Sequence, residues 1–173
     1  MKEKPDYEIY PVSEEEMGKR YKNWTESLAI QMAVVYQVGK EVGGEEFVEK
    51  LKEAYRGLGK LQAPMFMKMA GCAPEDFKDV RGIGKVSDTI DNRYANFWDG
   101  YIENSPTAFE KEIKTCPVAG AWANTPEICE VYLYELFKAM GEELNPDYKF
   151  LGFSKLLPKG DNCCRYRIEI EDK

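Results

Sequence analysis

Hydrophobic side chains recur at intervals of three and four residues along the first third of the chain, which is the spacing of one helix face. The residues of this stripe are Met17, Tyr21, Trp24, Leu28, Met32, Val35, Val38 and Val42. The stripe is widened in the middle by Ile30, Ala33 and Val34. The pattern therefore predicts a long helix whose middle is buried on most sides.

Capping residues and helix breakers divide the first half of the chain. Ser13 with Glu16 forms a capping box that starts the first helix, and Gly43-Gly44 is expected to end it. A second helix is predicted over 45–69, with a kink near Pro64. Short helical pieces are expected over 75–80 and 86–94, separated by a turn at the Gly82/Gly84 pair.

The spacing changes to that of strands after about residue 97. A hairpin is predicted over 97–103 and 108–115, around the turn formers of 104–107. A helix should run from Pro126, with Thr125 as its N-cap, to Met140 before Gly141. Two final strands are expected over 148–157 and 162–171.

These elements predict an α+β fold in which N-terminal helices pack on a C-terminal antiparallel sheet of about four strands with one inserted helix. The chain has 173 residues, which suits one domain with a sizeable core. We therefore interpret 1–173 as a single domain, with a tail over 1–12, a mainly helical half over 13–95 and a β-rich half over 96–173.

Composition narrows the range of functions. A net charge of −7 argues against nucleic-acid binding, which depends on a basic surface. The chain contains no histidine, which excludes Ser-His-Asp and Cys-His catalytic groups and histidine-based zinc sites. The start of the chain lacks an apolar leader, and the most apolar stretch, 27–38, is too short to span a membrane. With five cysteines, an odd number, this indicates a cytoplasmic protein with free thiols.

Two polar patterns near residue 85 give only weak evidence for a functional site. The segment 81–85 lacks both the first glycine and the final Ser or Thr of a phosphate-binding loop, so we interpret it as a turn. Asp88 and Asp91 lie three residues apart and could share a cation or act as acid and base. A solvated helix face is the simpler interpretation of this pair.

Strand alternation assigns the cysteines to faces. Cys164 shares a face with the apolar residues Tyr166 and Ile168 and should point inward, whereas Cys163 should point outward into water. Cys129 aligns with the apolar face of its helix and should also point inward. Cys116, which follows the hairpin, has the parity of charged residues and is expected at the rim of a cleft.

A set of short motifs in the second half resembles a known family. Cys116-Pro117, Cys129 in the following helix, Asn145-Pro146 before a strand, and the ending 159–167 (KGDNCCRYR) are similar to the C-terminal half of the L-2-amino-thiazoline-4-carboxylic acid hydrolase family. The resemblance covers about residues 95–171. The ending is also similar to vinyl-reductase-type domains and to their relatives of the TRAPP trafficking fold, which bind small molecules or acyl chains.

This resemblance implies a hydrolase that opens a small cyclic C–N bonded substrate such as an amino-thiazoline carboxylate, without a cofactor. Cys116 and Cys164 would be the reactive pair, Cys129 and Tyr166 would line the substrate pocket, and one thiol would need a lowered pKa. The alternative is a non-catalytic binding domain of the vinyl-reductase/TRAPP type for an apolar ligand. A thiolate metal site at Cys116, Cys129 and Cys164 is a third interpretation, without the paired spacing of zinc sites. The expected partner is a small molecule, with no nucleic acid and no membrane insertion, and a homodimer is compatible with the pattern.

Overall fold

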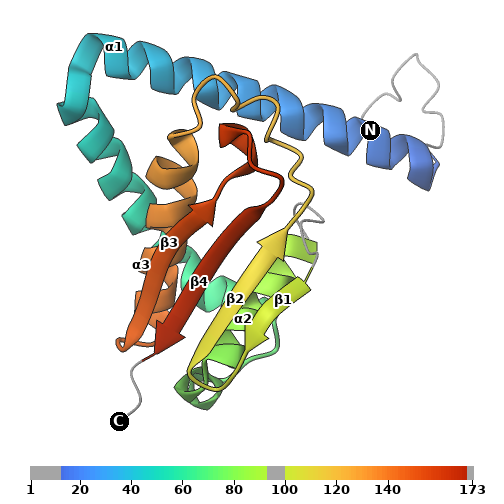
Figure 1. Cartoon of the computed structure of the whole chain (residues 1–173), viewed down its shortest axis with the longest axis vertical. Helices are drawn as coiled ribbons and strands as arrows, with labels where there is room; N and C mark the ends of the chain where they lie inside the picture. Colours follow the sequence, from blue (N-terminus) through green and yellow to red (C-terminus); the bar gives the residue numbers. More distant parts are fainter. Residues whose placement is uncertain (1–12, 93–99, 171–173) are drawn as a thin grey trace, which may run out of the picture.

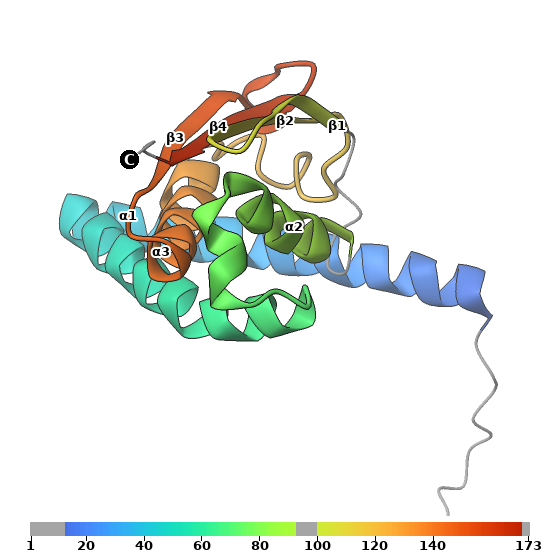
Figure 2. The ribbon, with the colours of Figure 1, turned by 90° about the horizontal axis from the view of Figure 1, so that it is seen from below.

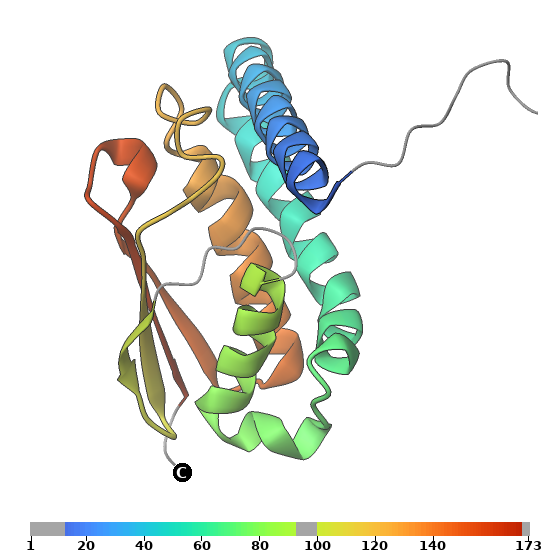
Figure 3. The same cartoon turned by 90° about the vertical axis from the view of Figure 1, so that its right-hand side faces the viewer.

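A computed structural model describes residues 13–92 and 100–170, and its elements form three layers (Figures 1–3). The sheet is one outer layer, helices α2 and α3 form the middle, and the long helix α1 is the other outer layer (Figure 3). The predicted tail over 1–12 and the predicted structure over 93–99 lie outside the described residues.

Helix α1, Glu14–Met69, consists of two arms that meet at Gly44. Gly44 has φ 58° and ψ −148°, a conformation that favours glycine, so the expected break at this pair is confirmed. Phe47 folds back from the second arm so that its ring lies against Gly39 of the first, where a Cβ atom would overlap it. Pro64 lies inside the second arm as expected.

The segment after α1 corrects the sequence interpretation at one point. The 3₁₀ helix η1, Pro74–Lys78, is followed by α2, Val80–Ile90, so the predicted Gly82/Gly84 turn is wrong. The side chain of Asp79 caps α2 by accepting from the backbone N–H of Arg81 at 2.9 Å. Gly82 is needed inside α2, since a Cβ there would overlap the backbone carbonyl of Asp76.

The four predicted strands form one antiparallel sheet in the order β1-β2-β4-β3, which confirms the α+β fold class. The strands are β1, Gly100–Asn104; β2, Ala108–Ile113; β3, Tyr148–Lys155; and β4, Cys164–Ile170. In β4 buried and half-buried residues alternate, so the predicted register of this strand is confirmed. Its buried residues join those of α1 and α2 in one hydrophobic cluster.

The inserted helix begins differently from the prediction. A six-residue π-helix η3, Cys129–Tyr134, precedes the regular helix α3, Glu135–Leu144. The hydroxyl of Thr125 is buried and has no hydrogen-bond partner among the described residues, so the expected side-chain cap is not formed. Gly141 does not end the helix, but allows the ring of Tyr148 to lie where a Cβ would be.

Most of the apolar stripe of the first arm of α1 is exposed, contrary to the prediction that the middle of this helix is buried on most sides. Trp24 is 61 % exposed and Val42 is 84 % exposed. The buried residues of this arm lie on another face: Ala29, Ala33 and Tyr36. That face contacts the loop after β2, where the indole of Trp122 donates to the carbonyl of Ala29 at 3.0 Å.

Within residues 13–92 and 100–170, no helix combines the length and the apolar character needed to cross a membrane.

Two glycines of the second arm test the packing of α1 on α3. Gly59 is buried, and a Cβ there would overlap the carbonyl oxygen of Leu136, whereas a Cβ at Gly57 would meet no atom. We expect Gly59→Ala to lower the free energy of unfolding by about 1–3 kcal/mol through overpacking. Gly57→Ala should raise it by about 0.5–1 kcal/mol, because alanine is the better helix former. Urea unfolding measures both, and equal effects would contradict the close α1–α3 crossing.

Candidate functional site

Three of the five cysteines lie close together between the sheet and η3. Cys116 lies in the loop after β2, Cys129 begins η3, and Cys164 begins β4. The thiols are near enough that Cys116 and Cys164 each raise the pKa of Cys129. Cys129 and Cys164 are buried as expected, and Cys116 is half-buried.

Burial dominates the ionisation of these thiols. It raises the pKa of Cys116 to about 11, against smaller opposing effects of hydrogen bonds from the backbone of Val118 and Ala119. Burial also raises the pKa of Cys129 and of Cys164, although the sulfur of Cys164 accepts from the backbone N–H of Leu157 at 3.3 Å. The lowered pKa that a nucleophilic thiol needs is therefore not found, and all three thiols are protonated at neutral pH.

The other two cysteines lie elsewhere. Cys163 is on the opposite face of the sheet from Cys164, but it is only 2 % exposed, so the expectation that it faces water is wrong. The charged side chains of Glu112, Lys155 and Arg165 lie near enough to affect the pKa of its thiol, which burial raises. Cys72 is half-buried in a polar cleft of about 360 Å³ beside Lys85.

Among residues 13–92 and 100–170, no group of three or more cysteine or acidic side chains has an arrangement that could hold a metal ion. The three neighbouring thiols thus do not form a thiolate metal site.

A second polar cluster lies in the core between α2 and the sheet. Lys111 of β2 is fully buried, and its Nζ donates to Asp91 at 2.5 Å, to Asp88 at 2.7 Å and to the Ser87 hydroxyl at 3.3 Å. The Tyr101 hydroxyl donates to both oxygens of Asp88 at 2.9 Å. The ammonium therefore has three polar partners and lies over the ring of Tyr101.

One ammonium faces two carboxyl groups in this cluster, and burial raises the pKa of Asp91. Burial alone would lower the pKa of Lys111, but Asp91 and Asp88 outweigh it and raise this pKa, which keeps the ammonium charged. Asp91 is 3 % exposed, so the interpretation of the aspartate pair as a solvated helix face is wrong. The sequence signal that was overlooked is the inward parity of Lys111 between Phe109 and Ile113.

Tyr166, predicted to line the substrate pocket with the thiols, belongs to the edge of this cluster. Its hydroxyl lies 2.8 Å from the Ser87 hydroxyl, and its ring packs against those of Phe109 and Phe150. This hydrogen bond directs the phenol toward α2.

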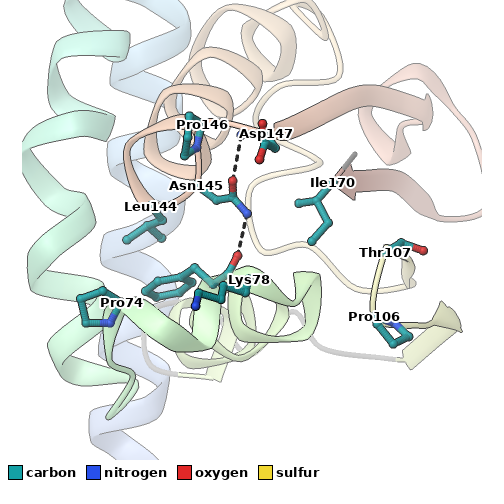
Figure 4. Close-up of a pocket in the computed structure, with 10 residues that line it drawn as sticks. Pro74, Lys78, Pro106, Thr107, Leu144, Asn145, Pro146, Asp147 and Ile170 are labelled. Carbon is teal, nitrogen blue, oxygen red and sulfur yellow. Dashed lines mark hydrogen bonds between the residues drawn. The ribbon is translucent and has the colours of Figure 1, made fainter. Parts of the chain in front are cut away.

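The largest cavity described is a cleft of about 530 Å³ at the far end of the sheet (Figure 4). Prolines and other apolar residues form most of its wall, and Lys78, Thr107 and Asp147 supply polar atoms. Asn145 holds one wall of this cleft in place. Its side-chain N–H donates to the carbonyl of Phe77 at 2.6 Å, and its side-chain oxygen accepts from the backbone N–H of Asp147 at 2.8 Å (Figure 4).

A second cavity, of about 240 Å³, is a groove between the two arms of α1 and η3. Its walls are almost wholly apolar and aromatic: Leu28, Gln31, Met32, Val35, Tyr36, Leu51, Tyr55, Ile128, Val131 and Tyr132. The rings of Tyr55 and Tyr132 are 4.6 Å apart at its base. Neither this groove nor the larger cleft is lined by Cys116, Cys129 or Cys164.

Comparison with known proteins identifies a fold. No protein-family model matches the sequence, and no curated protein matches it. The structure is similar to a crystal structure of a trafficking protein particle complex subunit 3 from Naegleria fowleri, covalently bound to palmitic acid. The TM-score is 0.61 at 14 % sequence identity, over 87 % of this chain and 97 % of that chain. The likeness shows a TRAPP-type fold, and it does not support the hydrolase family that the motifs resemble.

Removal of the buried ammonium tests the polar cluster. Lys111→Met leaves the buried carboxyl group of Asp91 and the half-buried one of Asp88 without their cationic partner, so we expect a loss of about 3–5 kcal/mol in the free energy of unfolding. Lys114→Met, three residues along and 67 % exposed, should change it by less than about 0.5 kcal/mol. Chemical denaturation measures both variants, and a loss for Lys111→Met no larger than that for Lys114→Met would contradict the pairing.

The raised thiol pKa values predict a fall in stability at alkaline pH. Unfolded thiols lose their protons near pH 8.5, whereas the pKa of folded Cys116 is about 11. The native state therefore binds more protons between these values, and the free energy of unfolding must decrease as the pH rises. We expect Cys116→Ala to show a shallower decrease than the unmodified chain in urea titrations from neutral to alkaline pH. A steeper decrease in the variant would show that the native thiol ionises early.

Proposed function

We propose that this protein is a non-catalytic module that binds an apolar small molecule, or the acyl chain of an amphipathic one, in the groove between α1 and η3. The observation that carries the proposal is the lining of that groove, in which Gln31 supplies the one amide and the tyrosines supply the remaining polar atoms. Apolar lining with a few polar groups is typical of ligand pockets.

The local structure of η3 gives a second reason. π-helical turns are uncommon and occur frequently at functional sites. This one presents Val131 and Tyr132 to the groove, next to the preceding residue Ile128, while Cys129 lies among the thiols and does not line the groove. The unusual turn thus contributes both to the apolar wall and to the cysteine cluster.

The size of the groove limits the ligand. At about 240 Å³ it is slightly smaller than most ligand pockets, which are roughly 300–1,000 Å³. We infer a small apolar molecule, or one end of a longer chain that continues over the surface. The similar solved structure holds palmitic acid, which makes a fatty acid the first ligand to test here.

Hydrolysis of a cyclic substrate at Cys116 and Cys164, with Cys129 and Tyr166 in the pocket, remains a prediction from the sequence. The reaction needs either a thiolate that attacks the substrate or a carboxylate that activates water, and burial raises the pKa of both thiols, which disfavours the thiolate. The phenol of Tyr166 is directed to Ser87 instead. The groove needs no ionised group to bind its ligand, and we therefore favour binding over catalysis.

Two leucines of α1 allow a matched test. Leu51 lines the groove, whereas Leu61 is 75 % exposed and lies outside it. Leu51→Trp should fill the groove and weaken the binding of palmitic acid by about tenfold or more, equivalent to losing at least 1.4 kcal/mol. Leu61→Trp should bind like the unmodified chain. Isothermal titration calorimetry gives the affinities, and intact mass distinguishes reversible binding from a thioester.

Equal affinities of the two variants would place the fatty acid elsewhere and refute the groove as its site. Turnover of an amino-thiazoline carboxylate that is lost in Cys116→Ala would support the hydrolase instead.

A further inference from the structure

The first arm of α1 has an apolar face that its own domain leaves uncovered. Seven of the eight residues of this face, which we call the seam, are apolar: Met17, Tyr21, Trp24, Leu28, Gln31, Val35, Val38 and Val42, of which Gln31 is the polar one. All are exposed, from 37 % for Leu28 to 84 % for Val42. The N-terminal end of the arm extends past the rest of the molecule (Figure 2), whereas Leu28, Gln31 and Val35 in the middle of the seam also line the groove between the two arms.

The spacing of the seam is that of a coiled coil. Its intervals alternate strictly between four and three residues from Met17 to Val42, which makes nearly four heptads. The residues that contact the domain, Ala29, Ala33 and Tyr36, occupy a separate face of the helix. A heptad seam of this length predicts a second helix packed along it.

From this spacing we propose that two copies of the chain associate through an antiparallel pairing of their seams. A two-fold axis between residues 29 and 30 would place Trp24 opposite Val35 of the second copy. The same operation brings Tyr21 opposite Val38 and Met17 opposite Val42. Each large side chain then faces a smaller one, whereas a parallel pair would put Trp24 against Trp24.

The charges beside the seam favour the same arrangement. Arg20 and Glu41 occupy the same position of the heptad, three repeats apart, and both are exposed. In the antiparallel pair Arg20 of each copy lies next to Glu41 of the other, at both ends of the interface. In a parallel pair Arg20 would lie next to Thr25.

A lipid surface fits the seam less well. Helices that lie on membranes carry a polar face rich in Lys and Arg. The polar residues near the start of this arm mix Glu14, Glu15 and Glu16 with Lys19 and Arg20, and the chain has a net charge of −7. The narrow seam and the mixed charges therefore select a second copy.

Sedimentation equilibrium of the full chain tests the association. We expect a species of twice the 19.9 kDa chain mass at micromolar concentrations. Val38→Lys should raise the dissociation constant about a hundredfold, because two buried apolar side chains are lost per dimer. Ile30→Lys is the control, since Ile30 is exposed on the same arm but outside the seam. Circular dichroism verifies that both variants fold.

A charge exchange tests the direction of pairing. Arg20→Glu and Glu41→Arg should each weaken the dimer, and the double variant should restore it, because the pair is re-formed with its signs exchanged. Failure of the double variant to recover would overturn the antiparallel arrangement.

A monomer across the micromolar range, or equal effects of Val38→Lys and Ile30→Lys, would overturn the dimer. If a monomeric chain instead sediments with phosphatidylcholine vesicles and Val38→Lys abolishes this, the seam binds lipid. Leu28, Gln31 and Val35 belong both to the seam and to the groove, but none of the substituted residues lines the groove. A failure here therefore leaves the proposed ligand site to be judged by its own titration.

Discussion

A charged lysine in the core must be paired, and this requirement fixes how the helical half of the protein meets the sheet. Lys111 projects inward from β2 with no exposed surface, and its two carboxylate partners both come from the end of α2. Because an unpaired buried charge would cost several kcal/mol, α2 can occupy only the position that brings Asp88 and Asp91 to the ammonium. Helix α2 in that position lies in the middle layer beside α3 (Figure 3).

The strands and the break in α1 at Gly44 were predictable, because the alternation of apolar and polar residues and the presence of glycine are local signals in the sequence. Four features were not predictable from such local signals. The inward direction of Lys111 in β2 indicates a buried ion pair only when α2 is known to pack against it. Cys163 is buried despite its outward parity. Most of the apolar stripe of α1 is exposed, because the domain packs against another face of this helix. The π-helix η3 follows from no local pattern that we recognise in the sequence.

The same distinction explains the candidate site. Parity and spacing predicted that Cys129 and Cys164 point inward, and the structure brings them together with Cys116. What makes a cysteine reactive is the charge around it, which depends on packing that the sequence does not display. In this protein the packing raises the pKa of the thiols, and none of the three lines the apolar groove. A shared neighbourhood of thiols is therefore compatible with a core rather than a catalytic centre.

We propose that the ligand binds in the apolar groove and not at the cysteine cluster. A crystal structure of the protein grown with palmitic acid tests this choice of site. We expect electron density for the acyl chain between the arms of α1 and η3, in contact with Leu51, Tyr55 and Val131. Density for the ligand beside Cys116 and Cys164, with the groove closed by side chains, would contradict it.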